Sequence, residues 1–236
     1  MNAQELFAPA GTSVSTSTVV FEYAIGDIIV GSTDNSNFQI TQGFSQPRSS
    51  SATVWTGAVN TDWNNPGNWS AGIPDNTDDI VISGGGNNPV INTAGATCKN
   101  LTISSGGFIT ISDASYSINV DTLKIENGAQ VTISNGAVYL NNIINSGTLN
   151  ISGGTLDIDD NYTASGNVNA NISGGTIKVE GNWTSSGSGF DPTGGTVEFS
   201  GNVAQTISLA AGNNFYDLKI NNSHASNKVS SLLIRS

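Results

Sequence analysis

The sequence predicts an all-β protein whose larger part is a right-handed parallel β-helix, with three strands and about 20 residues in each coil. Three observations support this prediction. Between Ile109 and Phe199, a pattern of two apolar residues at strand spacing, a gap and two further apolar residues occurs five times. Glycine is abundant, at 28 residues, and only 11% of the residues are charged, which suits tight turns and polar outer faces. No stretch has an apolar period of 3.6 residues long enough to predict a helix.

The five copies are predicted to share one internal spacing, with each second pair starting seven residues after its first pair. The first pairs are Ile109/Ile111, Val131/Ile133, Leu149/Ile151, Ala170/Ile172 and Phe190/Pro192. The second pairs are Tyr116/Ile118, Val138/Leu140, Leu156/Ile158, Ile177/Val179 and Val197/Phe199. Copies start 22, 18, 21 and 20 residues apart, so we expect the variation to lie between copies. Such a repeat cannot bury its own apolar face and must stack on its neighbours. A third strand position is predicted at Leu101/Ile103, Leu123/Ile125 and Leu218/Ile220.

The chain divides into four predicted parts. Residues 1–12 form a lead-in after signal cleavage, because Met1–Gln4 looks like the tail of a secretory signal. Residues 13–50 form a small antiparallel β module, since turn-forming residues interrupt their apolar alternation. Residues 51–79 form a Trp-rich cap, and residues 80–236 form a β-helix of roughly seven coils, about 35 Å long. Leu232–Ile234 still has the pattern of a core-facing strand, so we expect further coils beyond this chain.

Three of the four tryptophans, Trp55, Trp63 and Trp69, fall close together in the predicted cap. Large rings held by Pro and Asn turns can cover the apolar cross-section and the open strand edges at the end of a solenoid. The alternative is an exposed aromatic platform that binds a sugar. The sequence favours the cap, because the terminal repeats of a solenoid require one.

Several phrases of the sequence resemble those of known proteins. They are Trp55–Ala58, Asp62–Ser70 and Gly72–Ile82 near the start, Ala24–Asp27 and Thr41–Pro47 before them, and Gly194–Phe199, Ala204–Ser208 and Phe215–Ser223 near the end. Together they resemble the β-helical regions of large secreted bacterial surface proteins, both autotransporter passengers and the adhesin-like proteins of Bacteroidota. The resemblance implies a β-helix in a protein exported by type IX secretion. It implies no activity.

The charge pattern excludes some classes of partner. The formal net charge is −11 and the seven basic residues are spread thinly, so nothing neutralises phosphates or anionic lipid. We therefore expect no nucleic-acid binding and no membrane insertion. The lone Cys98 excludes an internal disulfide and is predicted to be a buried core residue.

Residues between the inward pairs are predicted to point outward and to form three ladders. The first ladder is Ser117, Tyr139, Asp157, Lys178 and Glu198, where alternating charges make favourable neighbours. The second is Asn119, Asn141, Asp159, Glu180 and Ser200, and the third is Thr110, Thr132, Asn150, Asn171 and Asp191. In the second, Asp159 and Glu180 beside Asn141 could bind calcium, but a solvated acidic patch is the favoured reading because no calcium-loop motif is present. A flat array of Thr can order ice or sugar, but only two of the five residues in the third ladder are Thr, and Asn stacks are ordinary β-helix packing.

Enzymatic activity has to be weighed, because polysaccharide lyases and glycosidases also use this fold. A lyase base is conceivable in Lys178 beside Asp157 and Asp159, but an ion-paired surface lysine is far more common. The only histidine, His224, lies in a turn rich in Ser and Asn. We predict no catalytic residue, cofactor or metal site.

The function predicted from the sequence is mechanical and adhesive. We expect an exported β-helical stalk or filament segment at the cell surface, presenting polar ladders to a glycan, another surface or a copy of itself. Its expected partners are other copies or further coils of the parent chain. The alternative is a carbohydrate-binding or lyase-like module. Asp121–Leu123 also resembles the O-glycosylation site of Bacteroidota proteins, and whether it is modified is left open.

Overall fold

The computed structural model describes residues 52–166 and 168–224, together with the backbone of four short strands between residues 12 and 42. The chain forms two units, Met1–Ser51 and Ala52–Ser236. In the first unit, β1 (Thr12–Ser15) pairs antiparallel with β2 (Val20–Tyr23). β3 (Gly31–Asn35) pairs antiparallel with β4 (Phe38–Gln42). These pairs agree with the antiparallel strands expected for residues 13–50, whereas the strand expected at Leu232–Ile234 lies outside the described residues.

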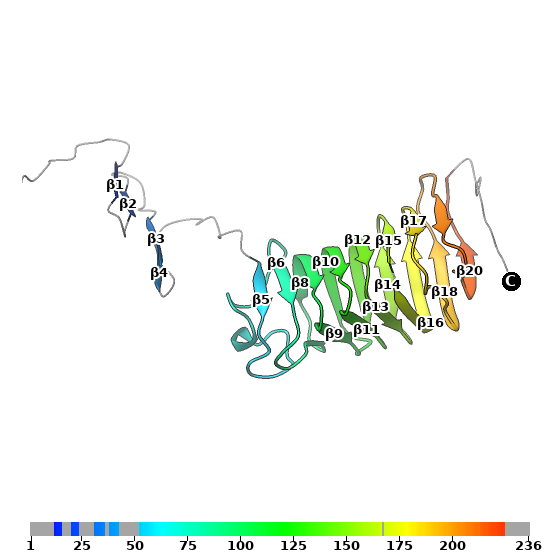
Figure 1. Ribbon diagram of the computed structural model, residues 1–236, viewed down its shortest axis with the longest axis horizontal. Helices are drawn as coiled ribbons and strands as arrows, with labels where there is room; N and C mark the ends of the chain where they lie inside the picture. Colours follow the sequence, from blue (N-terminus) through cyan, green and yellow to red (C-terminus); the bar gives the residue numbers. More distant parts are fainter. Residues whose placement is uncertain are drawn as a thin grey trace, which may run out of the picture. The chain divides into compact units, whose positions relative to one another are not determined.

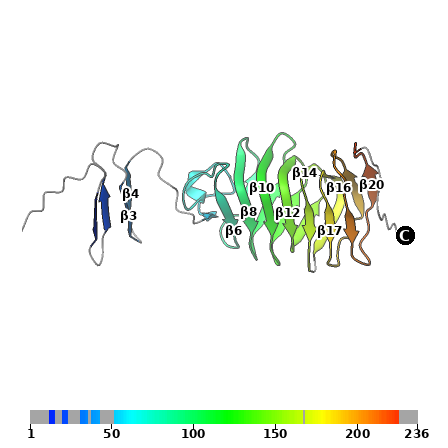
Figure 2. The same cartoon turned by 90° about the horizontal axis from the view of Figure 1, so that it is seen from above.

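The second unit is a parallel β-solenoid of about 7 turns, with about 21 residues per turn (Figures 1 and 2). Its strands form three faces, each made of parallel strands stacked one per coil. Face A consists of β7 (Val90–Ile91), β9 (Phe108–Ile111), β11 (Gln130–Ile133), β13 (Thr148–Ile151) and the start of β16 (Asn169–Val179). The predicted parallel β-helix with three strands per coil is therefore confirmed.

Faces B and C are continuous with each other in the middle coils, because one long strand bends from one face into the next. The long strands are β8 (Ala96–Ile103), β10 (Ser117–Ile125) and β12 (Ala137–Asn145). Face B continues through β14 (Thr155–Ile158), the end of β16, β18 (Gly194–Phe199) and β20 (Asp217–Ile220). Face C begins with β5 (Thr53–Trp55) and β6 (Asp79–Ile82), and ends with β15 (Tyr162–Ala164), β17 (Trp183–Ser185) and β19 (Ile207–Leu209).

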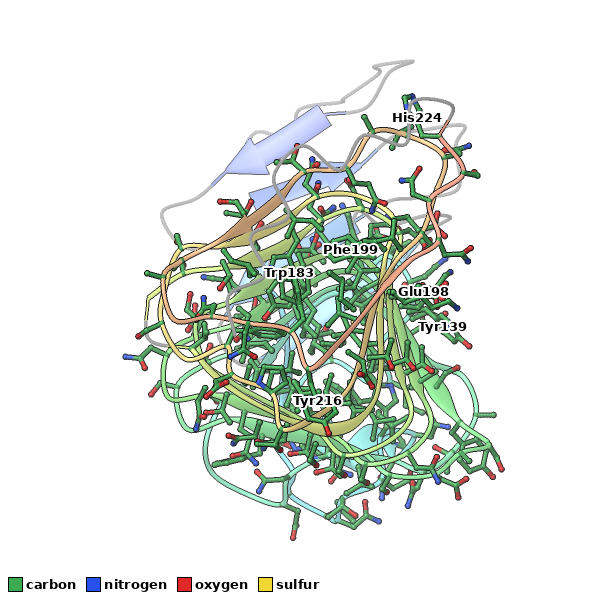
Figure 3. The ribbon with its side chains drawn as sticks, turned by 90° about the vertical axis from the view of Figure 1, so that its right-hand side faces the viewer. Tyr139, Trp183, Glu198, Phe199, Tyr216 and His224 are labelled. Atoms are coloured by element: carbon green, nitrogen blue, oxygen red, sulfur yellow. The ribbon has the colours of Figure 1, made fainter. Side chains whose placement is uncertain are left out.

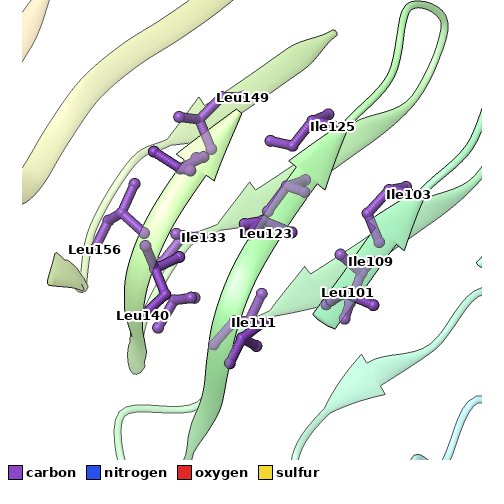
Figure 4. Packing of buried hydrophobic residues seen from close by; sticks show 14 of the residues in the cluster. Leu101, Ile103, Ile109, Ile111, Leu123, Ile125, Ile133, Leu140, Leu149 and Leu156 are labelled. Carbon is purple, nitrogen blue, oxygen red and sulfur yellow. The ribbon is translucent and has the colours of Figure 1, made fainter. Parts of the chain in front are cut away.

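The core is a set of apolar columns inside the coils. Alternate residues of each strand point inward, so that Leu123 lies between Leu101 and Ile143 of the neighbouring coils, and all three side chains are buried. Viewed along the solenoid, Trp183 and Phe199 lie inside the coils and Tyr139 and Glu198 lie outside (Figure 3). Each buried Leu or Ile side chain stabilises the fold by roughly 2 kcal/mol relative to exposure. The columns run through successive coils, so each coil completes the burial of its neighbours (Figure 4).

The structure corrects the register of the first predicted copy. Val138 and Leu140 lie opposite Ile118 and Val120, not opposite Tyr116 and Ile118. The turn before Ile118 is longer than in later copies, because the Asp113 side chain accepts a hydrogen bond from the Ser115 N–H and its carbonyl accepts one from the Tyr116 N–H. The prediction of one fixed internal spacing was therefore wrong for this copy.

A second correction concerns the third strand position. Leu218 and Ile220 lie opposite Val197 and Phe199 on face B. The third position at that level is held by Ile207 and Leu209 in β19, which pairs with β17 on face C. Leu218 and Ile220 were assigned to the wrong face because the connection from β18 to β19 is longer than those from β14 to β15 and from β16 to β17. A strand spacing cannot reveal how many residues a turn contains.

Glycine pairs build the corner from face A to face B. Gly154 and Gly175 both have φ of +71°, in the left-handed region that favours glycine. A Cβ added at Gly153 would lie 2.5 Å from the Ser134 carbonyl oxygen of the preceding coil, and one at Gly174 would lie 2.5 Å from that of Ser152. The corner therefore excludes side chains because the coils stack in close backbone contact.

Candidate functional site

The first outward ladder runs along face B and carries alternating charges. Asp157 lies opposite Lys178, Lys178 opposite Glu198, and Glu198 opposite Lys219. Lys178 Nζ lies 3.3 Å from Asp157 Oδ1 and 3.2 Å from Glu180 Oε1, and Lys219 Nζ lies 3.0 Å from Glu198 Oε2. The predicted neighbours of opposite sign are confirmed. At the other end of the ladder, the residue opposite Tyr139 is Asn119 and not Ser117, because of the longer turn before Ile118.

Lys178 is held in its charged form. Burial opposes that form, but hydrogen bonds to Glu180 and Asp157 outweigh it and raise the pKa of Lys178 above its ordinary value. A general base has to be uncharged before it accepts a proton. The pairing therefore argues against Lys178 as a base.

The second ladder passes the corner between faces B and C. Its first member is Asp121 and not Asn119, because Asp121 lies between two residues that pair with Leu140 and Asn142. Further along, the Asp159 N–H donates to the Leu140 carbonyl and the Glu180 N–H donates to that of Ile158, which places these carboxylates on adjacent coils as predicted.

The surroundings of Asp159 favour its protonated form. Partial burial, and then the charges of Asp157 and Glu180, raise the pKa of Asp159 above its ordinary value. Among the described residues, no group of three or more His, Cys, Asp or Glu side chains has the arrangement of a metal site. The solvated acidic patch stays the prediction for Asp159 and Glu180, with calcium binding beside Asn141 as the alternative.

The third ladder, on face A, has the predicted register. Thr110 pairs with Thr132, Thr132 with Asn150, and Asn150 with Asn171. Asn150 Nδ2 donates to Thr132 Oγ1 at 3.2 Å, and Asn171 Nδ2 donates to Asn150 Oδ1 at 2.7 Å. These amides use their hydrogen bonds to join one coil to the next.

A further asparagine ladder was missed in the sequence. It lies at the corner between faces B and C and consists of Asn142, Asn161 and Asn182. The Asn142 side-chain oxygen accepts from the Asn161 N–H at 3.2 Å, and the Asn161 oxygen accepts from the Asn182 N–H at 2.9 Å. The signal that could have found it is asparagine recurring at the coil period shortly after each second inward pair.

The three clustered tryptophans are buried. Trp69 packs edge-on against both Trp55 and Trp63, with ring centroids 4.8 and 4.7 Å apart. Trp63 is 0% exposed, so these rings offer no platform to a sugar. β5 belongs to the same sheet as β6, and its other edge is closed by an antiparallel bridge between Trp55 and Trp69. The stretch expected as a cap is thus the closed first turn of the solenoid.

Asn68 organises this turn, and sequence reasoning missed it. Its side chain is fully buried and makes four hydrogen bonds: it accepts from the N–H groups of Val59 and Asn60, and donates to Asn60 Oδ1 and to the Asp62 carbonyl. A short 3₁₀ turn (Pro66–Asn68), capped by the Asn65 side chain, holds Asn68 in place.

The remaining sequence candidates have structural positions. Cys98 is buried as predicted, and burial, followed by the nearby carboxylate of Asp121, raises the pKa of its thiol far above the ordinary value, which makes it unreactive. His224 follows Asn222, whose side-chain oxygen accepts from its N–H. Asp121–Leu123 lies inside β10 with Leu123 in the core, and its glycosylation stays a prediction.

A family model described as a domain of unknown function (DUF8693) matches residues 54–173, just over half of the chain. The chain belongs to this family. No curated protein and no solved structure matches this chain. The matched DUF8693 residues begin in β5 and end inside β16, so they include the closed first turn and the following coils through Tyr139 and Asp157. No helix of the described residues is long and apolar enough to cross a membrane.

Proposed function

We propose that this chain is an exported structural and adhesive segment, a stiff β-helical rod that projects from or coats a cell surface. The observation that carries the proposal is that outer side chains bind one another from coil to coil. Lys178 pairs with Asp157, Lys219 with Glu198, and Asn171 with Asn150. Opening one coil would break these ladders as well as the backbone ladder and the core columns, which favours a stiff spacer.

Export by type IX secretion is part of this proposal. It is supported by the phrases that resemble the adhesin-like proteins of Bacteroidota. The outer faces of the rod would meet a glycan, another surface or further copies of the chain.

We assign no catalytic role to the face B ladder. The lyase-like alternative needs Lys178 as a base, and its ion pairs favour the charged ammonium. An assay for uronate cleavage with calcium present tests this directly. Activity that disappears in Lys178→Ala would overturn the structural proposal.

The location is tested by adding an antibody against residues 52–224 to intact, non-permeabilised producing cells. The expected result is labelling of the chain while a cytoplasmic marker stays unlabelled. Labelling that appears only after lysis would contradict export.

Stiffness is tested by pulling the full chain between its ends in a single-molecule force experiment. If coils open one at a time, extension should grow in steps of about 21 residues, or roughly 7 nm each at the reach of an extended chain. Smooth extension at low force, without steps, would contradict a stiff rod.

A further inference from the structure

Face B carries one exposed aromatic ring in the middle coils. Tyr139 lies on the outer side of β12 and is 44% exposed. Asn119 is opposite on the preceding coil and Asp157 on the following one. Figure 3 shows the Tyr139 side chain outside the coils, on the same side as Glu198. The ring is therefore accessible from solvent on a regular sheet surface.

Polar side chains surround this ring. We call Asn119, Asp121, Tyr139, Asn141 and Asp159 the Tyr139 patch, and all five are exposed. Neighbouring coils are about 4.8 Å apart, and alternate residues of one strand are about 6.6 Å apart. Each of the four polar residues is thus one or two such steps from Tyr139, which is the reach of one or two sugar rings.

The polar side chains of the Tyr139 patch differ from the outward asparagines elsewhere on the solenoid, which bind one another from coil to coil. Within the described residues, the side chains of Asn119, Asp121, Asn141 and Asp159 make no hydrogen bond to the protein. On face A, by contrast, Asn150 and Asn171 bind each other, and at the B–C corner Asn161 binds Asn142. The patch therefore keeps both donors and acceptors available to a ligand.

The chemistry of the patch selects one class of ligand. The face of a tyrosine ring is electron-rich and attracts the polarised C–H groups on one side of a pyranose ring. Amides and carboxylates around it can bind the hydroxyl groups at the rim of the same sugar. Asp121 and Asp159, on a chain with a net charge of −11, repel anions.

We propose that the Tyr139 patch binds a glycan without acidic groups, with Tyr139 stacked on a sugar ring and Asn119 and Asn141 bound to its hydroxyls. Glycan binding at this patch rests on the proposed function of a surface-exposed rod. It would identify the partner of one outer face as a neutral glycan.

The test is isothermal titration of the full chain with cellohexaose, mannohexaose and xylohexaose, beside hexagalacturonate as the acidic probe. At least one neutral hexasaccharide should bind, and more tightly than hexagalacturonate. Tyr139→Ala should weaken this binding at least about tenfold, and Asn141→Ala about threefold. Tyr216→Ala is the matched control, because Tyr216 is 60% exposed and lies outside the patch. Circular dichroism should be unchanged in all three variants.

The proposal is overturned if no neutral hexasaccharide binds, if hexagalacturonate binds more tightly, or if Tyr216→Ala loses as much affinity as Tyr139→Ala. Binding of octalysine, but of no sugar, at Tyr139 would overturn it in favour of a basic partner. Export is judged separately by the antibody labelling of intact cells, so sugar binding can fail while the surface rod stands.

Discussion

The two ends of the described solenoid differ in how their core columns are finished. At the first turn, Trp55, Trp63 and Trp69 are buried together and β5 is closed on its outer edge. At the last described coil, Phe215 and Leu218 are only partly buried, and Ile220 is 45% exposed. The difference teaches that a solenoid end is closed by irregular chain and not by another regular coil, because a regular coil always leaves a new edge.

Aromatic residues are used at both ends, with different results. Near the last coils, Trp183 stacks on Tyr162 with ring centroids 3.7 Å apart, and its edge contacts reach Phe190 and Phe215. Tyr162 and Trp183 pair in register on neighbouring coils, so their stack runs along the solenoid axis and extends the core. In the first turn, Trp69 bridges to Trp55 on the outer edge of β5, which ends the core there.

The largest expected effect comes from breaking the column between the two ends. Ile158 is fully buried, so Ile158→Asp would place an unpaired carboxylate in the core, at a cost greater than one coil interface supplies. We expect several coils to unfold, measured as lost β signal in circular dichroism and rapid proteolysis on both sides of residue 158. Ile144→Asp is the control, because Ile144 is 41% exposed. A folded, protease-resistant Ile158→Asp variant would contradict the assigned register.

Removal of the Asn68 side chain should have the next largest effect, and it acts on the closed end alone. Asn68→Ala removes all four hydrogen bonds of a buried side chain, including those accepted from the Val59 and Asn60 N–H groups, which should lower the unfolding free energy by about 3 kcal/mol. Urea unfolding monitored by tryptophan fluorescence measures it. Asn65→Ala is the matched control, since its side chain makes one exposed hydrogen bond, to Gly67. Equal losses in the two variants would show that Asn68 does not organise the turn.

A direct comparison of the ends uses one aromatic residue from each. Trp63→Ala removes a fully buried ring and should cost about 3–5 kcal/mol. Phe215→Ala removes a partly buried ring and should cost about 1–2 kcal/mol, in proportion to the smaller area taken from water. The midpoints of thermal unfolding rank the two variants. A Phe215→Ala variant as unstable as Trp63→Ala would mean that the far end is covered as fully as the first turn.

The smallest effect is a pH dependence near the last described coil. Hydrogen bonds from Lys219, and then from Asn221, lower the pKa of Glu198 below its ordinary value of 4.5. A carboxylate with a lowered pKa adds stability above its unfolded pKa, and this stability is lost as the pH falls through the folded pKa. We expect the stability difference between the native chain and Glu198→Gln to shrink as the pH falls below about 4.5. Chemical unfolding at several pH values measures this stability difference. If the difference grows towards low pH, the ion pair between Glu198 and Lys219 does not stabilise the fold.

Several features were predictable because their physical signal is local. Alternation at Val138 and Leu140 identified inward positions, and the coil period identified the pairing of Asp157 with Lys178. The error at Tyr116 came from a turn whose extra residues are polar and change no apolar alternation. Asn68 could not be found either, because one buried asparagine among many exposed ones has the same sequence signal.

The sequence by itself determined the all-β class, the parallel stacking and the inward columns. The spacing of its apolar residues shows both the strand period and the coil period. Only the tertiary structure decided which outward asparagines bind one another and which remain free. Asn150 and Asn171 join two coils, while Asn119 and Asn141 beside Tyr139 face solvent, although all four are outward asparagines of the same repeat. The physical reason is that a hydrogen bond depends on what lies opposite on the next coil, which turn lengths set and residue type does not.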